Sequence, residues 1–231
     1  MIDDGPLGIV CTSVTRRYTD GTQAVTALEG FSEHFRAGEV VAVTGPSGSG
    51  KSTLLALLAA IDYADEGTIH VGTTELGSLS TVEQSRFRAE RISYLYSDHN
   101  LLPILTVYEN ISLALSLKRL PEFEVDRRIR ESLDRLGLAD LAHRKPLDLS
   151  AGQRAQAALV RALAADNPVL IADEPTAHLD EENASLVAEL LTTLSSDARH
   201  LVILATHDPL VAAYADRVVR LRGVPAEERS G

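Results

Sequence analysis

A glycine-rich segment that ends in a lysine is the strongest chemical signal in this sequence. Residues 45 to 52 read Gly-Pro-Ser-Gly-Ser-Gly-Lys-Ser, which matches the phosphate-binding pattern G-x-x-x-x-G-K-[ST]. Glycines let successive backbone N–H groups turn toward phosphate oxygens, Lys51 supplies a point charge, and Ser52 can ligate Mg²⁺. The pattern predicts a nucleotide-phosphate site made of Gly45, Pro46, Ser47, Gly48, Ser49, Gly50, Lys51, Ser52 and Thr53.

Two adjacent carboxylates follow a short apolar run much later in the chain. Val169 to Ala172 reads as a buried strand, and Asp173 and Glu174 come directly after it. Open α/β sheets bind their ligands beyond the carboxyl ends of the strands. In phosphoryl transfer, one acid at that edge can hold Mg²⁺ and its neighbour can polarise the attacking water. Asp173 is therefore predicted to be a metal ligand and Glu174 the catalytic base.

These side chains need strands and helices to position them. Residues 39 to 44 read as a buried strand and residues 52 to 61 as a helix, so the glycine-rich loop joins a strand to a helix. Further along, the apolar runs 169 to 172 and 201 to 205 flank a helix at about 181 to 194. Strands that alternate with helices in this way predict a parallel sheet and an α/β core.

The rest of the chain supplies a second sheet and a helical region. Residues 7 to 15 and 25 to 35 contain short apolar runs and alternation around an Asp20-Gly21 turn signal, which predicts an antiparallel N-terminal sheet. Helical periodicity covers the ranges 106 to 120, 124 to 136 and 151 to 165.

Composition limits the class of protein and its partners. The chain has 231 residues, with 22 Lys and Arg against 33 Asp and Glu, so its formal charge is −11. This balance argues against broad electrostatic binding to nucleic acid or to an anionic membrane surface. A single cysteine, Cys11, indicates a reducing compartment, and the longest apolar stretch, residues 54 to 61, is too short to span a bilayer. One compact domain over residues 1 to 231 is expected.

A five-residue peptide before the helix at 151 to 165 carries a more specific signal. It reads Leu149-Ser150-Ala151-Gly152-Gln153, and Ser150 is a good N-cap whose hydroxyl and following amides can face an anion. The peptide resembles the LSGGQ signature of ATP-binding-cassette (ABC) ATPases, and the resemblance covers nearly the whole chain. It implies a P-loop NTPase cassette with a RecA-like core, an antiparallel β subdomain near residues 1 to 35, an inserted helical subdomain at about 97 to 165, and a polar tail at about 223 to 231.

The resemblance also implies how an ATP site is completed. In this family two chains pair head to tail, and ATP with Mg²⁺ on the phosphate loop of one chain meets the signature of the other. Here the signature residues would be Ser150, Ala151, Gly152 and Gln153. Asp180, in the peptide Ala177-His178-Leu179-Asp180, matches the loop that crosses the dimer. His207 resembles the switch histidine at the γ-phosphate and Tyr18 the aromatic that stacks on adenine. Lys51, Glu174 and His207 would then carry catalysis.

Three residues depart from the family pattern. Ser97 stands where a glutamine usually contributes to the metal shell, and it is too short to span the same distance. The sequence leaves three alternatives open: water completes the shell, Asp98 or His99 substitutes, or hydrolysis is slow and differently coupled to the partner. Ala151 replaces a glycine; its methyl group is tolerable if φ is negative and obstructive if φ is positive or if the backbone must touch phosphate. Gln156 replaces an arginine that is common in related sequences.

The subgroup is indicated by Leu101-Leu102-Pro103 and by residues 106 to 111. They resemble ABC ATPases that serve lipoprotein release, macrolide or peptide export and a related cell-division complex. This implies a membrane permease as partner, a peripheral location on the cytoplasmic side of the cell membrane, and a homodimer or heterodimer. Residues 97 to 120 would be either the permease-docking surface or ordinary core. The alternative function is a slow ATP-gated switch that regulates a membrane partner, while soluble ABC ATPases of DNA repair or translation need longer chains.

Overall fold

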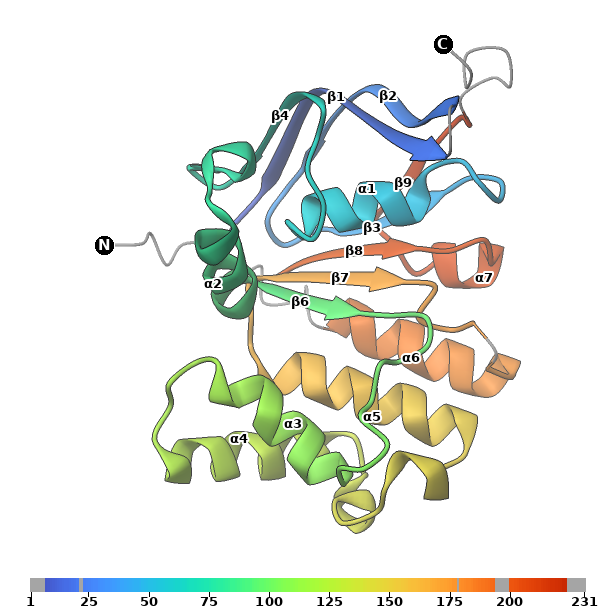
Figure 1. The fold of residues 1–231 in the computed structure, drawn as a ribbon. Helices are drawn as coiled ribbons and strands as arrows, with labels where there is room; N and C mark the ends of the chain where they lie inside the picture. Colours follow the sequence, from blue (N-terminus) through green and yellow to red (C-terminus); the bar gives the residue numbers. More distant parts are fainter. Residues whose placement is uncertain (1–6, 21–22, 178, 194–199, 224–231) are drawn as a thin grey trace.

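The computed structural model describes residues 7–20, 23–177, 179–193 and 200–223 (Figure 1). The predicted turn residue Gly21, His178 and the tail from residue 224 onward lie outside the described residues. Within the described part, no helix is both long enough and apolar enough to cross a bilayer.

Five parallel strands form the central sheet. They are β3 (Val40–Thr44), β6 (Ile92–Leu95), β7 (Val169–Asp173), β8 (Leu201–Ala205) and β9 (Arg217–Arg220), arranged in the order β6-β7-β8-β3-β9. The three central strands are nearly continuous Val, Ile, Leu and Ala, as expected for strands covered on both faces. The parallel sheet predicted from the alternating pattern is confirmed. The edge strands β6 and β9 were not predicted, because each has only four residues and both carry polar side chains.

Four strands form a second, antiparallel sheet. They are β1 (Ile9–Asp20), β2 (Gln23–Phe35), β4 (Glu66–Val71) and β5 (Thr74–Glu75), in the order β2-β1-β4-β5. The N-terminal hairpin is confirmed, but the antiparallel sheet extends beyond the predicted residues 1 to 35, because β4 and β5 also belong to it. β4 pairs with β1, so that Val71 lies opposite Ile9. This pairing joins two segments that are separated in sequence by the whole phosphate loop and its helix. No local sequence pattern predicts it.

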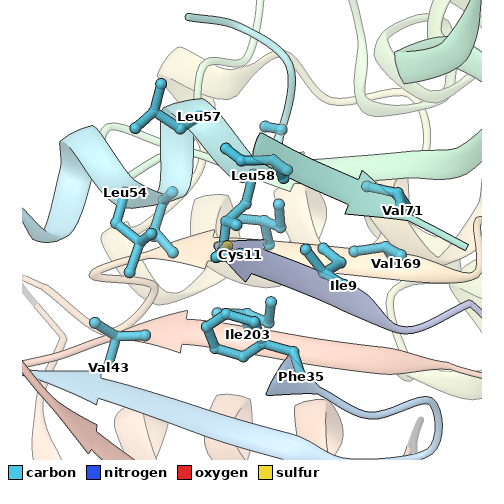
Figure 2. Packing of buried hydrophobic residues seen from close by; sticks show 14 of the residues in the cluster. Ile9, Cys11, Phe35, Val43, Leu54, Leu57, Leu58, Val71, Val169 and Ile203 are labelled. Atoms are coloured by element: carbon cyan, nitrogen blue, oxygen red, sulfur yellow. The ribbon is translucent and has the colours of Figure 1, made fainter. Parts of the chain in front are cut away.

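Helix α1 (Lys51–Leu58) lies between the two sheets and joins them into one core (Figure 1). Leu54 and Leu58 are fully buried and share a cluster with Val43 of the parallel sheet and with Ile9 and Phe35 of the antiparallel sheet (Figure 2). Burial of each such side chain contributes about 1.5–3 kcal/mol. The core therefore fixes the beginning of α1, where the glycine-rich loop ends.

The opposite face of the parallel sheet is covered by α5 (Ala151–Ala164) and α6 (Glu181–Thr193) (Figure 1). Leu159 of α5 packs toward the sheet, whereas Val160 packs on a helical layer made of α3 (Val107–Ser116) and α4 (Glu122–Arg135). Capping boxes start two of these helices: Thr106 with Glu109 at α3, and Ser150 with Gln153 at α5. The remaining helices are α2 (Thr81–Arg91) before β6, α7 (Pro209–Ala212) after β8, and the short 3₁₀ turns η1 (Leu76–Ser78), η2 (Ala139–Leu141) and η3 (Pro146–Asp148).

Candidate functional site

Sheet order brings the predicted site residues together at one edge. The glycine-rich loop follows β3, His207 follows β8, Asp173 and Glu174 end β7, and Ser97 follows β6. Backbone bonds link these neighbouring strand ends. The Thr206 amide donates to the carbonyl of Val43 at 3.1 Å, and the Glu174 amide donates to the carbonyl of Ala205 at 3.0 Å. Residues that are far apart in sequence therefore share the carboxyl edge of the sheet, where α/β proteins bind ligands.

The glycine-rich loop wraps the side chain of Lys51. Lys51 Nζ donates to the carbonyl oxygens of Gly45 at 2.9 Å and Pro46 at 3.2 Å, so the ammonium lies over the loop. Gly48 has a φ of 74°, and a Cβ placed there would meet no atom within 4 Å. The Ser49 hydroxyl is buried and has no hydrogen-bond partner among the described residues. A cation held by neutral carbonyls beside open space, on a loop that ends at the N-terminus of α1, fits a bound triphosphate.

A serine hydroxyl and a carboxylate meet beside this loop. The Ser52 side chain lies near Asp173, and burial raises the pKa of Asp173, with a further increase from the neighbouring Glu174. Ser52 and, to a smaller extent, Lys51 lower the pKa but do not cancel these effects. No group of three or more His, Cys, Asp or Glu side chains in the described residues has metal-site geometry. Two hard oxygen donors beside a phosphate site fit Mg²⁺, which keeps waters and phosphate oxygens as its other ligands.

Glu174 and His207 form a hydrogen-bonded pair. Glu174 Oε2 lies 2.9 Å from His207 Nδ1, and the side chain of His207 is 74% exposed whereas that of Glu174 is 20% exposed. Glu174 has a φ of 47°, a left-handed conformation that costs a non-glycine residue about 1–3 kcal/mol. The backbone bonds of Glu174, to Ala205 and from the Ala177 amide at 3.0 Å, hold it in this conformation. A carboxylate fixed against an exposed imidazole can orient and deprotonate a water molecule.

Ser97 lies at the same sheet edge but in an exposed turn. Asp98 accepts the Asn100 amide at 3.1 Å, so its carboxylate caps this turn, and the residue His99 is buried. Arg161 of α5 donates to the carbonyl of His99 at 2.9 Å and also to that of Asn100. The two side chains considered as substitutes for the missing glutamine are thus parts of the turn, and the metal role of Ser97 stays a prediction.

Tyr18 lies in a stack of charged and aromatic side chains. The Arg16 guanidinium lies 4.6 Å from the centroid of the Tyr18 ring and 4.1 Å from that of Tyr63. The Tyr18 hydroxyl donates to Asp62 at 2.8 Å, and Arg16 forms a 2.8 Å ion pair with the same carboxylate. Tyr18 is 39% exposed, so part of its ring is accessible to a base. Its adenine-stacking role stays a prediction, and the partners Arg16 and Asp62 were not predicted.

The signature peptide begins α5 on the face of the parallel sheet opposite α1 (Figure 1). Ser150 accepts the Gln153 amide at 3.2 Å, as predicted for an N-cap. Ala151 is the first residue of the helix, and it is not among the described residues with positive φ, so its methyl group is tolerated. Within one chain, the phosphate loop and the signature therefore start helices on different layers. A second copy is the natural source of a signature that faces this phosphate loop.

Asn183 is a neighbour of the signature that sequence reasoning missed. Its side chain lies against Gly152, and it binds the carboxylate of Asp180, which precedes α6. An Asp followed three residues later by a short polar side chain is a helix-start pattern that could have indicated the bond to Asp180. The contact with Gly152 is a tertiary contact between two helices, and no local pattern predicts it.

Comparison with known proteins places this geometry in a family. The family described as ABC transporter matches residues 28–177. The lipoprotein-releasing system ATP-binding protein LolD of Chromohalobacter salexigens is 37% identical over 211 residues, which cover 91% of this chain and 89% of that protein. The macrolide export ATP-binding/permease protein MacB of Burkholderia lata is 37% identical over 209 residues, which cover 90% of this chain and 30% of MacB.

Solved structures give the same likeness. The dimeric post-hydrolysis state of the ATP-binding cassette MJ0796, bound to ADP and Pi, matches with a TM-score of 0.87 and 32% identity over 93% of this chain and 94% of that one. The curated relative MJ0796 of Methanocaldococcus jannaschii, an uncharacterized ABC transporter ATP-binding protein, is 34% identical over 214 residues, which cover 91% of each chain.

Proposed function

Because the chain belongs to the ABC transporter family, as an ATP-binding cassette that hydrolyses ATP and pairs with another cassette, we propose that it drives a membrane permease in lipoprotein release or in macrolide or peptide export. One observation supports ATP hydrolysis: the Glu174–His207 pair and the Ser52–Asp173 pair both lie beside the phosphate loop. The similarity to LolD and MacB supports the transport part.

The phosphate loop would bind the triphosphate. Lys51 would exchange the carbonyls of Gly45 and Pro46 for phosphate oxygens, because an ammonium–phosphate contact is stronger than one to a neutral acceptor. Ser52 and Asp173 would hold Mg²⁺. A water molecule would take the ligand position that Ser97 is too short to reach. When bound, Mg²⁺ would neutralise the charge of the phosphate oxygens.

Hydrolysis would use Glu174 as general base. The carboxylate would orient one water and accept its proton, while His207 would keep the carboxylate in place and face the γ-phosphate. Phosphoryl transfer needs little covalent chemistry, so positioning and charge stabilisation supply most of the rate enhancement.

The second copy would complete each site. The N-terminal end of α5 can meet an anion through the Ser150 hydroxyl and the amides of residues 151 and 152, while the Gln153 amide is bonded to Ser150. Ser150, Gly152 and Asp180 of one chain would then face the triphosphate on the other. The partner cassette can be an identical chain or a sister subunit.

A surface on the helical layer supports a membrane partner. Residues 97 to 120 contain both core and surface side chains. Ile111 and Leu115 are fully buried in the core, whereas Ile104, Leu113 and Leu117 are half or more exposed. The exposed side chains would contribute to the docking surface for the permease. The chain would work on the cytoplasmic side of the cell membrane as a peripheral subunit.

ATP turnover by the purified chain tests the catalytic assignment. Lys51→Ala is expected to lower turnover by at least about a hundredfold, because the ammonium faces the transferring phosphoryl group. Lys145→Ala is the matched control, since Lys145 is exposed and lies on the helical layer. Unchanged turnover in Lys51→Ala, or full turnover in Glu174→Gln, would contradict the assigned roles.

The exposed position of Ser97 favours one alternative, a slow ATP-gated switch that regulates a membrane partner. The turnover number of the wild-type chain, measured with and without its permease, separates the two functions. A value below about 0.01 s⁻¹ in both states, far under the usual enzyme range, supports the switch. A value of about 1 s⁻¹ or more with the permease supports transport.

A further inference from the structure

The side chain of Asn183 joins the start of α5 to the start of α6. A Cβ placed on Gly152 would lie 2.8 Å from Asn183 Oδ1 and 2.9 Å from Asn183 Cγ. Real Cβ atoms do not approach other atoms this closely, so the amide of Asn183 occupies the space that any other residue at 152 would need. Gly152 is buried in the second position of α5, between Ala151 and Gln153.

The same amide is tied to Asp180. Asn183 Nδ2 donates to both carboxylate oxygens of Asp180, at 2.8 and 2.9 Å, and the Asn183 backbone amide donates to Asp180 Oδ1 at 2.9 Å. These bonds, the backbone one foremost, lower the pKa of Asp180. The carboxylate is therefore ionised and fixed at the end of the loop that precedes α6.

We propose that Asn183 is a positioning residue that locks the N-terminal end of α5 to Asp180, so that one chain presents both to the nucleotide of its partner as a rigid unit. The inference rests on the proposed function, because it assigns Gly152 and Asp180 to a site shared between two copies. Asn183 itself touches no reacting atom in this arrangement.

The chemistry of the amide explains why this residue type suits the position. Its oxygen faces the glycine at the start of α5, and its N–H₂ group holds the carboxylate, so one planar group serves two segments. An aspartate in its place keeps the shape but replaces two donors with a negative charge beside Asp180. Because the site also receives a triphosphate, that charge would repel the ligand as well.

The test uses the Glu174→Gln chain with saturating ATP and Mg²⁺, in which hydrolysis no longer reopens the dimer. The measured quantities are the dimer dissociation constant, from light scattering over a dilution series, and the ATP affinity of the dilute monomer. Asn183→Ala in this background is expected to weaken dimerisation about tenfold, a coupling typical of contacting residues, and to leave monomer ATP affinity unchanged. Asn183→Asp, which keeps the side-chain shape, is expected to weaken it further.

Gly152→Ala supplies an independent arm. Its methyl group must displace the Asn183 amide, so it is expected to weaken dimerisation, and combining it with Asn183→Ala should cost little more than Asn183→Ala alone. Glu189→Gln, an exposed substitution in the middle of α6, is the matched control.

Three outcomes would overturn the inference. Dimerisation of both Asn183 variants at the parent level, or fully additive effects of Asn183→Ala and Gly152→Ala, would remove the positioning role while leaving the proposed function intact. Failure of the Glu174→Gln parent itself to dimerise with ATP and Mg²⁺ would instead remove the shared site on which the inference rests.

Discussion

At the scale of single residues, the site contains a carboxylate whose ionised form destabilises the folded protein but is the form that binds a metal ion. This carboxylate is that of Asp173. Burial and the adjacent Glu174 raise its pKa. Asp173 is therefore expected to lower the stability of the ligand-free protein at the pH values at which its carboxylate is ionised. A bound metal ion would reverse that cost, because it favours the ionised form. The site is therefore built for a ligand at the expense of the free protein.

Asp173→Asn tests this trade-off. A carboxyl group whose pKa is higher in the folded than in the unfolded chain loses its stabilising contribution as pH rises through the folded pKa. The variant lacks this titration, so its Tm is expected to exceed that of the wild type at pH 7.5. The difference should shrink as the pH falls and disappear below about 4, where the aspartic acid becomes neutral in the unfolded chain too.

Thermal unfolding of both proteins over this pH range, with magnesium and nucleotide left out, is the measurement. Turnover of the variant should be lost although its Tm is higher. A Tm difference that is constant with pH, or a lower Tm at pH 7.5, would contradict the account.

His207→Ala separates positioning from binding. The imidazole holds Glu174 at 2.9 Å but lies outside the phosphate loop, so turnover is expected to fall about 10²- to 10³-fold while ATP affinity changes less than about threefold. His70→Ala is the matched control, because that imidazole lies 3.9 Å from the Glu75 carboxylate on the antiparallel sheet. Equal effects of the two substitutions would show that the Glu174–His207 pair has no special role.

The types of these residues could be read from the sequence, but their partners could not. The glycine-rich loop, the Asp173-Glu174 pair and the capping serine of α5 each have a local pattern, and the structure places each of them at the predicted strand or helix end. The contacts of Asn183 with Gly152 and of Asp62 with Tyr18 cross between elements. Such contacts follow from packing, which no single stretch of sequence contains.

At the scale of elements, the phosphate loop depends on the antiparallel sheet as well as on its own strand and helix. A Cβ on Gly50, where φ is 92°, would lie 2.3 Å from the carbonyl oxygen of Ala27 in β2. Strand β2 therefore lies in close contact with Gly50, the N-cap residue of α1. The two sheets and α1 also share a core, so a shift of the hairpin would move the loop (Figure 2).

Gly50→Ala is the corresponding prediction. The added methyl group must displace a backbone carbonyl, and the alanine must adopt a left-handed φ. We therefore expect the free energy of unfolding to fall by about 2–4 kcal/mol. Gly77→Ala is the control, since its nearest neighbour would lie 3.8 Å away and its φ is not positive. Denaturant unfolding of both variants checks the expectation, and a loss below about 0.5 kcal/mol for Gly50→Ala would show that β2 does not constrain the loop.

Elements also differ in how well a sequence announces them. The helices of the middle region have clear periodicity: α3 and α5 lie within the predicted ranges, and α4 begins two residues before its predicted start. The helix α2 was missed because its few apolar residues, Val82, Phe87 and Ala89, do not recur at helical spacing, whereas those of the equally polar α4 do. The strands β4 and β5 are short and half exposed, and they become recognisable only when paired with β1.

At the scale of the whole molecule, the two halves of a catalytic site lie on different layers of one chain. The phosphate loop begins α1 on one face of the parallel sheet, and the signature begins α5 on the other face (Figure 1). A single chain can therefore bind a nucleotide but cannot surround it. Pairing of two chains around ATP is the central claim, and it explains why binding and release of one ligand can move a partner in the membrane.

The most direct test is the molar mass of the Glu174→Gln chain in solution, measured by light scattering with and without ATP and Mg²⁺. We expect a monomer without nucleotide and a dimer with it, and the same chain carrying Lys51→Ala should remain monomeric throughout. A chain that binds ATP and magnesium tightly yet keeps the mass of a monomer, alone and with any sister cassette, would contradict the claim.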